Sequence, residues 1–314
     1  MKFKTLAFAT ILGLTTSFTV SAQVTFDYKD QNIQLKKNPK KIAVYDLSAL
    51  DILNTLGLEA QLVPSASFAG NLSKYQQDKF TKAGSLFEPD LNVLKAAKPD
   101  LIIVGGRSAS KAEAVKGIAP TLDLSPDTSQ YIVDLTERTH VLARAFGKEK
   151  IATEKLGKIA TLQQQLKKQT EDKTALMLFA VGENFMPHAE NDRFGFVYEL
   201  AGFKPVLDPS EQSNAPRPEA GSPEALKAAE KNVQRITAAV EKNPDYIIVL
   251  DRGAVNTQKY TAQDNIQKHP ALKNAKALAE KKVIYVNADA WYITGAGLDN
   301  TAFMLEELIK GTAN

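Results

Sequence analysis

The chain has 314 residues, of which 44% are hydrophobic and 24% are charged, and it contains no cysteine. This composition is that of an ordinary soluble globular protein, long enough for two cores and built without disulfides. The formal net charge is only +3, and the one dense basic stretch, "KKNPKK" at 36–41, is interrupted by Asn38-Pro39. The sequence therefore gives no indication of a nucleic-acid partner.

Residues 1–22 have the pattern of a secretory signal peptide. Lys2 and Lys4 form a positively charged region, Leu6 to Leu14 is a short apolar run, and a small-residue cleavage site follows at 20–22. The mature chain is expected to begin at Gln23. Because no cysteine is available for lipid attachment, we predict a free protein of a Gram-negative periplasm. No later stretch approaches 18 uninterrupted apolar residues, so no membrane span is expected after it.

Strand and helix patterns alternate between residues 23 and 147, which we predict to form a first α/β lobe. This alternation predicts a parallel sheet with helices on both faces. The expected elements are a strand at 41–45, a helix at 46–57 closed by Gly57, a helix at 91–98, a strand at 100–104, a helix at 110–117 and a strand at 121–124.

A long amphipathic helix is predicted at 148–170, where an apolar stripe repeats among charged residues. The α/β pattern then resumes at 171–314, which predicts a second lobe. Its expected elements are strands at 175–181, 246–251 and 282–287, a helix at 264–279 and a final helix at 299–310 ended by Gly311. The predicted fold class is therefore α/β, with two Rossmann-like lobes of parallel sheet joined by one long helix.

Two strands are written almost identically, as "KPDLIIVGGR" at 98–107 and "NPDYIIVLDR" at 243–252. Ligands of open parallel sheets bind at the carboxyl ends of the strands, so Arg107 and Arg252 are expected to face one cleft. Arg193 lies at the beginning of "RFGFVYELAG", where another helix is expected to start. Guanidinium groups present forked, permanently charged donors to anionic oxygens. The alternative is that each arginine pairs with a surface carboxylate.

Trp291 and Tyr292 follow the last predicted strand in "ADAWYITGAG". A tyrosine there either packs into the core or offers a phenolate to a hard metal such as Fe(III). Enzyme motifs are missing: there is no G-x-S-x-G, Walker A, G-x-G-x-x-G after a strand or H-E-x-x-H, and the three histidines are scattered. We therefore expect a binding protein and not an enzyme.

The segment 208–223 contains four prolines and no apolar periodicity. A loop of this length is either a mobile lid or a solvent-exposed insertion, and the sequence leaves both interpretations open.

Five segments together resemble the periplasmic siderophore-binding proteins of iron ABC importers, especially the ferric catecholate branch. The resemblance covers essentially the whole mature chain and is carried by "IAVYDLSALDILNTLG", "LFEPDLNVLKAAKPDLIIVGGR", "DRFGFVYELAGFKPV", "NPDYIIVLDR" and "KVIYVNADAWYITGAGL". It implies two lobes bridged by one helix, with the ligand held in the cleft between them.

The resemblance also implies site residues. Arg107, Arg193 and Arg252 would neutralise a ferric catecholate, Tyr292 would complete the iron coordination, and Trp291 would belong to the siderophore-binding set. The ligand would be an Fe(III)-siderophore complex without any intrinsic cofactor, and a monomeric protein would deliver it to an inner-membrane ABC permease.

The sequence departs from this family at two places. Relatives carry a second iron ligand, a histidine, before the "NPDY" strand, where this chain has none; His188 and Glu230 are the candidates here. Relatives also dock through one glutamate per lobe, and the matching residues are Asn92 and Thr237. Glu88 or Asp90 would substitute in the first lobe.

Alternative ligands for the same fold are haem, a carboxylate siderophore and a corrinoid. Haem would need an axial ligand, for which Tyr292 or His188 would serve. An alternative of a different class is an enzyme, such as an esterase that acts on siderophores. It would need a Ser-His-acid triad, and the sequence lacks the G-x-S-x-G motif that carries the nucleophilic serine of such enzymes.

Overall fold

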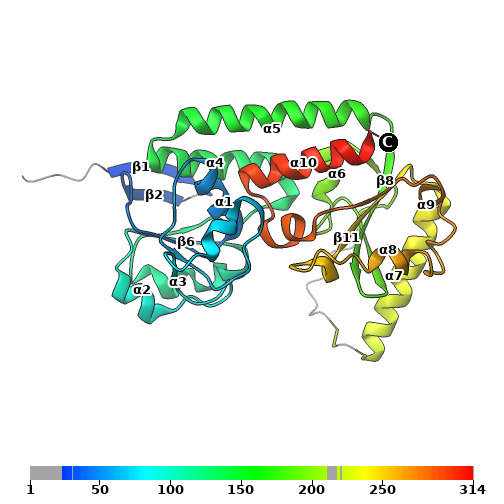
Figure 1. The fold of residues 1–314 in the computed structure, drawn as a ribbon, viewed down its shortest axis with the longest axis horizontal. Helices are drawn as coiled ribbons and strands as arrows, with labels where there is room; N and C mark the ends of the chain where they lie inside the picture. Colours follow the sequence, from blue (N-terminus) through cyan, green and yellow to red (C-terminus); the bar gives the residue numbers. More distant parts are fainter. Residues whose placement is uncertain (1–22, 30, 211–217, 220, 314) are drawn as a thin grey trace, which may run out of the picture.

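The protein, seen here as a computed structural model, is described over residues 23–29, 31–210, 218–219 and 221–313. The predicted signal peptide and residues 211–217 and 220 of the proline-rich segment lie outside the described residues. Two α/β lobes lie side by side, and α5 (Glu149–Gln169) runs along both of them (Figure 1). This arrangement confirms the predicted fold class. Among the described residues, no helix is long and apolar enough to cross a membrane.

The first lobe is built on a five-stranded parallel sheet in the order β5-β4-β3-β6-β7, with Ala43 of β3 opposite Ile102 of β6. An antiparallel pair that the sequence analysis did not predict, β1 and β2, precedes it. The elements are β1 (Gln23–Tyr28), β2 (Gln31–Lys36), β3 (Ile42–Val44), α1 (Leu47–Thr55), β4 (Leu62–Val63), η1 (Gly70–Gln76), β5 (Thr81–Lys82), α2 (Leu91–Ala97), β6 (Leu101–Val104), η2 (Gly106–Lys111), α3 (Ala112–Lys116), β7 (Thr121–Asp123), η3 (Thr128–Gln130) and α4 (Tyr131–Phe146).

The second lobe has a parallel sheet in the order β10-β8-β11-β12, to which β9 adds an antiparallel strand beside β8. Ile248 of β11 lies opposite Met177 of β8. The elements are β8 (Thr174–Val181), β9 (Asn184–His188), α6 (Phe196–Ala201), β10 (Lys204–Pro205), α7 (Pro223–Glu241), β11 (Tyr246–Asp251), η4 (Arg252–Ala254), α8 (Ala262–Ile266), α9 (Lys276–Ala279), β12 (Val283–Tyr285), the π-helix η5 (Asp289–Thr294) and α10 (Leu298–Thr312).

The Pro-Asp of the repeated stretch has the same structural role in both lobes. The Asp100 carboxylate accepts the backbone N–H of Lys41 at 3.0 Å, just before β3. The Asp245 carboxylate accepts the backbone N–H of Thr174 at 2.9 Å, at the start of β8. In each lobe the aspartate ties the start of one parallel strand to the start of its neighbour, so the two sheets are locally equivalent.

One hydrophobic core runs through both lobes. Leu50 of α1, Leu142 of α4, Met177 of β8 and Leu305 of α10 are fully buried members of the same cluster. The C-terminal helix α10 begins beside the first lobe and runs along α5 to end against the second lobe (Figure 1). Burial of this shared apolar surface therefore resists separation of the lobes.

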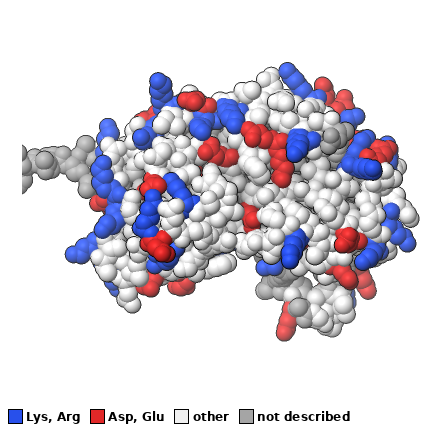
Figure 2. Space-filling model, viewed as in Figure 1, with Lys and Arg blue, Asp and Glu red and all other residues white. Residues whose placement is uncertain are grey.

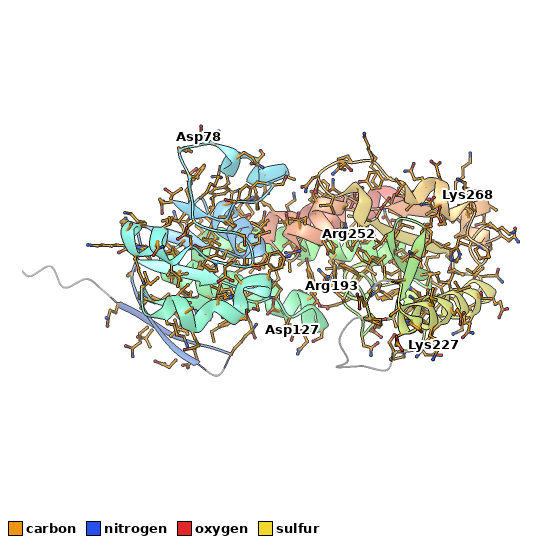
Figure 3. The ribbon with its side chains drawn as sticks, turned by 90° about the horizontal axis from the view of Figure 1, so that it is seen from below. Asp78, Asp127, Arg193, Lys227, Arg252 and Lys268 are labelled. Atoms are coloured by element: carbon orange, nitrogen blue, oxygen red, sulfur yellow. The ribbon has the colours of Figure 1, made fainter. Side chains whose placement is uncertain are left out.

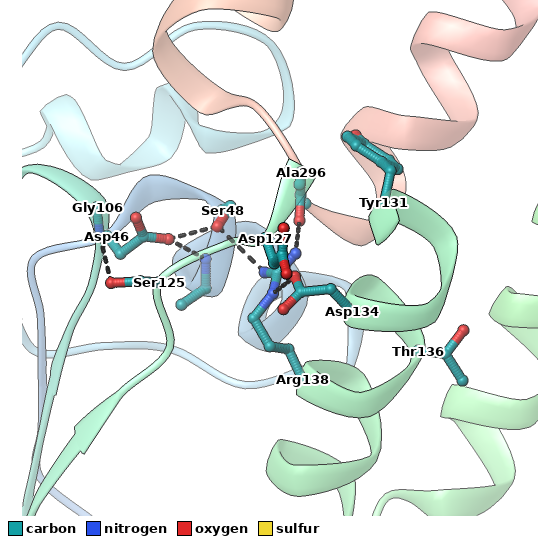
Figure 4. Close-up of polar contacts among 12 residues, drawn as sticks. Asp46, Ser48, Gly106, Ser125, Asp127, Tyr131, Asp134, Thr136, Arg138 and Ala296 are labelled. Carbon is teal, nitrogen blue, oxygen red and sulfur yellow. Dashed lines mark hydrogen bonds and ion pairs between the residues drawn. The ribbon is translucent and has the colours of Figure 1, made fainter. Parts of the chain in front are cut away.

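A buried arginine connects the lobes with hydrogen bonds. Arg138 of α4 is fully buried and donates to Asp134 at 2.6 Å, to Ser48 of α1 at 3.2 Å and to the carbonyl oxygen of Ala296 at 2.8 Å (Figure 4). Asp134 and Ser48 belong to the first lobe, whereas Ala296 follows η5 in the second. This network fixes the segment after η5 against the first lobe.

Three expected helices differ in the structure. The helix expected at 264–279 is two short helices, α8 and α9, because Pro270 between them cannot continue a helix. The segment expected as a helix at 110–117 is helical as η2 and α3. Gly311 lies inside α10 and does not end it. A Cβ at Gly311 would lie 2.9 Å from Ile284 Cδ1, so this glycine permits close packing on the sheet.

Candidate functional site

Three arginines from separate segments surround the ring of Tyr292. The guanidinium carbon lies 5.8 Å from the ring centroid for Arg107, 4.9 Å for Arg193 and 5.8 Å for Arg252. Arg193 and Arg252 lie near each other where the two lobes meet (Figure 3). The structure therefore brings together the three arginines and the tyrosine that the sequence analysis selected. We call these four residues the arginine–tyrosine cluster.

Arg107 reaches across from the first lobe to the second. It is half-buried and donates from Nη2 to the carbonyl oxygen of Tyr292 at 2.8 Å and from Nη1 to that of Ile293 at 3.4 Å. Arg193 and Arg252 are exposed. Within the described part of the chain, no carboxylate lies within 4 Å of these three guanidinium groups as an ion-pair partner. Among the described residues, the predicted alternative of pairing with surface carboxylates is therefore not seen for these arginines.

Local structure explains where two of the arginines lie. Asp251, fully buried at the end of β11, accepts the backbone N–H groups of Gly253 and Ala262, both at 2.8 Å, and so fixes the turn that begins at Arg252. Arg107 follows two glycines, of which Gly106 has a φ of +49°, a left-handed conformation that favours glycine. Both arginines therefore leave the carboxyl end of a parallel strand through a fixed turn.

The charges in the cluster act on its ionisable groups. Burial raises the pKa of Tyr292, but a hydrogen bond from Arg252 and the charges of Arg193 and Arg252 outweigh it, so the pKa lies below its usual value near 10. Burial, and then the charge of Arg193, lower the pKa of Arg107. The cluster is a cationic surface that favours a phenolate at Tyr292 and an anion as its ligand.

An aromatic floor supports Tyr292. Its ring stacks on Phe179 with centroids 5.6 Å apart and an interplanar angle of 12°. Phe179 in turn packs on Phe194 at 5.0 Å. The sequence analysis missed Phe179, although it lies near the carboxyl end of β8, the edge at which the arginines were sought. The floor holds the tyrosine ring in one orientation beneath the guanidinium groups.

Trp291 lies in the core. It is 2% exposed, stacks on Phe196 at 5.5 Å, and donates from Nε1 to Glu307 at 2.8 Å. This burial argues against direct contact of Trp291 with a ligand, and its membership of the siderophore-binding set stays a prediction. Adjacent residues of a helical turn point in different directions, so η5 buries Trp291 while Tyr292 contacts the arginines. Trp291 positions the turn that carries Tyr292.

The two candidates for a second iron ligand occupy different places. His188, in β9, packs its ring against Phe194 at 5.1 Å, and burial lowers its pKa to about 4, so it is neutral at neutral pH. Its Nδ1 is buried and has no hydrogen-bond partner among the described residues. Glu230 is exposed on α7. No group of three or more His, Cys, Asp or Glu that could hold a metal occurs in the described part of the chain.

The residues at the expected docking positions, Asn92 on α2 and Thr237 on α7, are both exposed. Asp90 caps α2 by accepting the N–H of Asn92 at 2.9 Å. Glu88 forms an ion pair with Lys111 at 2.6 Å. Acidic and basic side chains are interspersed over the visible face of both lobes (Figure 2).

Two α/β lobes held by one long helix, with a cationic cluster where they meet, define the class of two-lobe ligand-binding proteins. Residues 42–290 match the family model described as periplasmic binding protein. The chain belongs to that family. It is therefore a binding protein and not an enzyme.

Named relatives cover nearly the whole chain. The petrobactin-binding protein YclQ of Bacillus subtilis is 29% identical over 303 residues, which are 94% of this chain and 90% of YclQ. The ferric-anguibactin-binding protein FatB of Vibrio anguillarum is 26% identical over 287 residues, which are 88% of this chain and 84% of FatB.

Solved structures show the same similarity. The crystal structure of YclQ matches with a TM-score of 0.80 at 26% identity, covering 93% of this chain and 99% of that one. The periplasmic catecholate-siderophore binding protein VctP of Vibrio cholerae matches with a TM-score of 0.77 at 25% identity, covering 91% of this chain and 99% of that one.

Proposed function

We propose that this protein is the substrate-binding component of an iron ABC importer and that it binds an anionic Fe(III)-catecholate siderophore in the arginine–tyrosine cluster. The names of its relatives support siderophore binding, and the name of VctP supports a catecholate siderophore as the ligand. In this proposal the Fe(III)-siderophore complex is cargo and not a cofactor of the protein.

The observation that carries the proposal is the set of three guanidinium groups 4.9–5.8 Å from one tyrosine ring, without a carboxylate partner among the described residues. Each catecholate brings two negative charges, so an iron bound by two or three of them carries net negative charge. A unit charge ~4 Å from one arginine gains about 4 kcal/mol of gross Coulomb energy at an effective dielectric of about 20. The cluster therefore favours anionic over neutral iron complexes.

Tyr292 adds a donor for iron itself. Fe(III) prefers hard oxygen ligands, and the lowered pKa of Tyr292 makes its phenolate more available. We propose that this oxygen completes the coordination when the siderophore supplies fewer than six donors. The ring of His188 packs edge-on against Phe194 and Phe179, so we assign the protein ligand to Tyr292 alone.

Fluorescence titration tests the ligand class. Trp291 is the only tryptophan and lies next to Tyr292, so a ferric complex bound at the cluster should quench its emission. The panel consists of a ferric bis-catecholate, a ferric tris-catecholate, a neutral ferric trishydroxamate, ferric citrate and haem. Saturable quenching by a catecholate at micromolar or lower concentration is expected. Absence of binding by both catecholates would refute the ligand assignment.

Ferric citrate is the second candidate. The Fe(3+)-citrate-binding protein YfmC of Bacillus subtilis is 25% identical over 260 residues. A ferric carboxylate is also anionic, so the arginines would serve it equally well. Binding of citrate in the same panel without binding of either catecholate would favour this function.

The setting of the function is also a proposal. We propose that residues 1–22 direct export to the periplasm, and that the monomeric protein delivers its ligand to an inner-membrane permease. The exposed ends of α2 and α7, near Asn92 and Thr237, are the proposed docking positions.

A further inference from the structure

A cavity of about 450 Å³ lies between the lobes and is lined by residues other than the arginine–tyrosine cluster. One wall comes from residues 69–71 at η1 in the first lobe. The other walls come from η5, α10 and the segment after β11 in the second lobe. Its volume falls within the ~300–1,000 Å³ typical of ligand pockets. The described part of the chain therefore has a half-open cavity, apart from the arginine–tyrosine cluster, that is large enough for a small molecule.

The lining of this cavity carries negative charge only. Among the described residues, Asp289 and Asp299 line it, whereas no Lys, Arg or His does. Asp289 is 6% exposed, and its two oxygens accept from the N–H of Asn256 at 2.8 Å and from Nε2 of Gln258 at 2.6 Å. Asp299 pairs through Oδ1 with Lys155 at 3.3 Å, and no described cation pairs with its Oδ2. The cavity is thus opposite in charge to the arginine–tyrosine cluster.

Two carboxamides of the lining are oriented by their hydrogen bonds. Asn300, 9% exposed, donates from Nδ2 to the carbonyl oxygens of Ala290 at 2.9 Å and Gly295 at 2.6 Å. Asn71 donates from Nδ2 to Asp51 at 2.5 Å. Because the amide nitrogens are committed to acceptors, each Oδ1 is the atom left for a ligand, and no described residue donates to either. Apart from the hydroxyl of Thr294, which can donate or accept, the side-chain polar groups that this cavity can still offer are therefore hydrogen-bond acceptors.

We propose that this cavity binds a small aliphatic amine in its ammonium form. An ammonium group has three donors and no acceptor, which matches the oxygens of Asp299, Asn71 and Asn300. Phe303 and Ala290 supply apolar surface for the methylene chain. Because η1 and η5 belong to different lobes, the bound amine contacts both. The arginine–tyrosine cluster repels such a cation, so the two sites do not compete for one ligand.

Calorimetric titration of the iron-free protein with 1,4-diaminobutane tests this site, with 1,4-butanediol as the neutral analogue of the same length. We expect the diamine to bind at least tenfold more tightly than the diol and to raise the unfolding temperature. Asp299→Asn should weaken diamine binding at least fivefold. The matched control is Glu306→Gln on the same helix, which removes a similar pair with α5 (Lys158, 2.8 Å) but does not line the cavity.

Two further variants complete the test. Phe303→Trp adds bulk at a half-exposed wall residue and should weaken diamine binding without unfolding the protein. Tyr292→Phe should leave diamine binding unchanged, which separates this site from the proposed siderophore site. Equal binding of the diol and the diamine, or equal diamine affinities of Asp299→Asn and the wild type, would overturn the proposal.

Discussion

Tyr292 is the residue on which the chemistry of the proposed site depends. The hydrogen bond from Arg252 and the charges of Arg193 and Arg252 lower its pKa, although its partial burial acts in the opposite direction. Burial raises the pKa of most other tyrosines, to about 12 for Tyr75 and Tyr285. Tyr292 is thus the phenol in this chain that is most ready to ionise.

Ultraviolet titration of phenolate absorbance should resolve this residue. As pH rises from 8 to 11, the first step in phenolate absorbance should come from Tyr292. We expect this step to be absent from the Tyr292→Phe variant. Arg252→Gln should shift that first ionisation to higher pH, because it removes the hydrogen bond and a positive charge. Tyr260→Phe is the control, since burial raises the pKa of Tyr260 and its loss should leave the first ionisation in place. An unchanged first ionisation in Tyr292→Phe would contradict this account.

At the scale of elements, the turn that precedes both β6 and β11 was predicted in part from the sequence. The similar stretches predicted matching strands with an arginine after each. The backbone adds that Lys98 and Asn243 both have a φ of +51°, and that the following aspartates bond to a neighbouring strand. Which strand each aspartate bonds to depends on the order of strands in the sheet. Local sequence patterns do not determine that order, so these hydrogen bonds could not be predicted.

Replacing one of these aspartates tests the role of the turn. Burial raises the pKa of Asp245, but hydrogen bonds from Thr174 outweigh it and lower the pKa overall. The carboxylate therefore stabilises the fold above the ordinary aspartate pKa of about 4, and this contribution is lost as pH falls through the lower folded value. Asp245→Ala should lower the free energy of unfolding by about 1–2 kcal/mol at pH 7, and by less at pH 3.

Urea denaturation at both pH values measures this difference. Asp172→Asn is the control, because the exposed Asp172 pairs with the exposed Lys204 and asparagine tolerates its left-handed backbone (φ +59°), so little change in stability is expected at either pH. A loss at Asp245→Ala that stayed the same at pH 3 and pH 7 would show that the carboxylate charge is not what stabilises this turn.

Other elements show where local pattern failed. The alternation of Val24, Phe26 and Tyr28 was a readable strand signal that the analysis passed over, and it forms β1. The burial of Trp291 could not be predicted from the sequence, because nothing in the segment after β12 indicated the π-helix η5. This helix turns Trp291 into the core and Tyr292 toward the arginines. Arg107 and Arg252 were predicted because each follows a parallel strand, and Arg193 through the family resemblance, whereas Phe179 and the interlobe cavity depend on packing between distant segments.

At the scale of the whole molecule, the lobes are joined by more than α5. Arg138 links α4 and α1 to the carbonyl oxygen of Ala296, close to the helix that carries Tyr292. Arg107 crosses the same boundary to Tyr292. The relative position of the lobes therefore sets the geometry of the arginine–tyrosine cluster.

Loss of Arg138 should be costly, because its partner Asp134 is also buried. We expect Arg138→Met to lower the free energy of unfolding by about 3 kcal/mol, the lower end of the usual cost of breaking a buried ion pair, because the buried Asp134 keeps only the more distant Lys29 at 3.6 Å. The double variant with Asp134→Asn removes this poorly paired charge and should recover part of the loss. Chemical denaturation measures both, and a single-variant loss below about 1 kcal/mol would show that the network does not hold the lobes.

The central claim is that the arginines select an anionic ferric complex, and calorimetric titration of Arg252→Ala tests it most directly. The ligands are an anionic ferric catecholate and a neutral ferric trishydroxamate, and Arg144→Ala, an exposed arginine on α4, is the control. We predict that Arg252→Ala weakens catecholate binding at least ~10-fold, or about 1.4 kcal/mol, and changes hydroxamate binding little. Equal losses for both complexes, or none for the catecholate, would contradict the account.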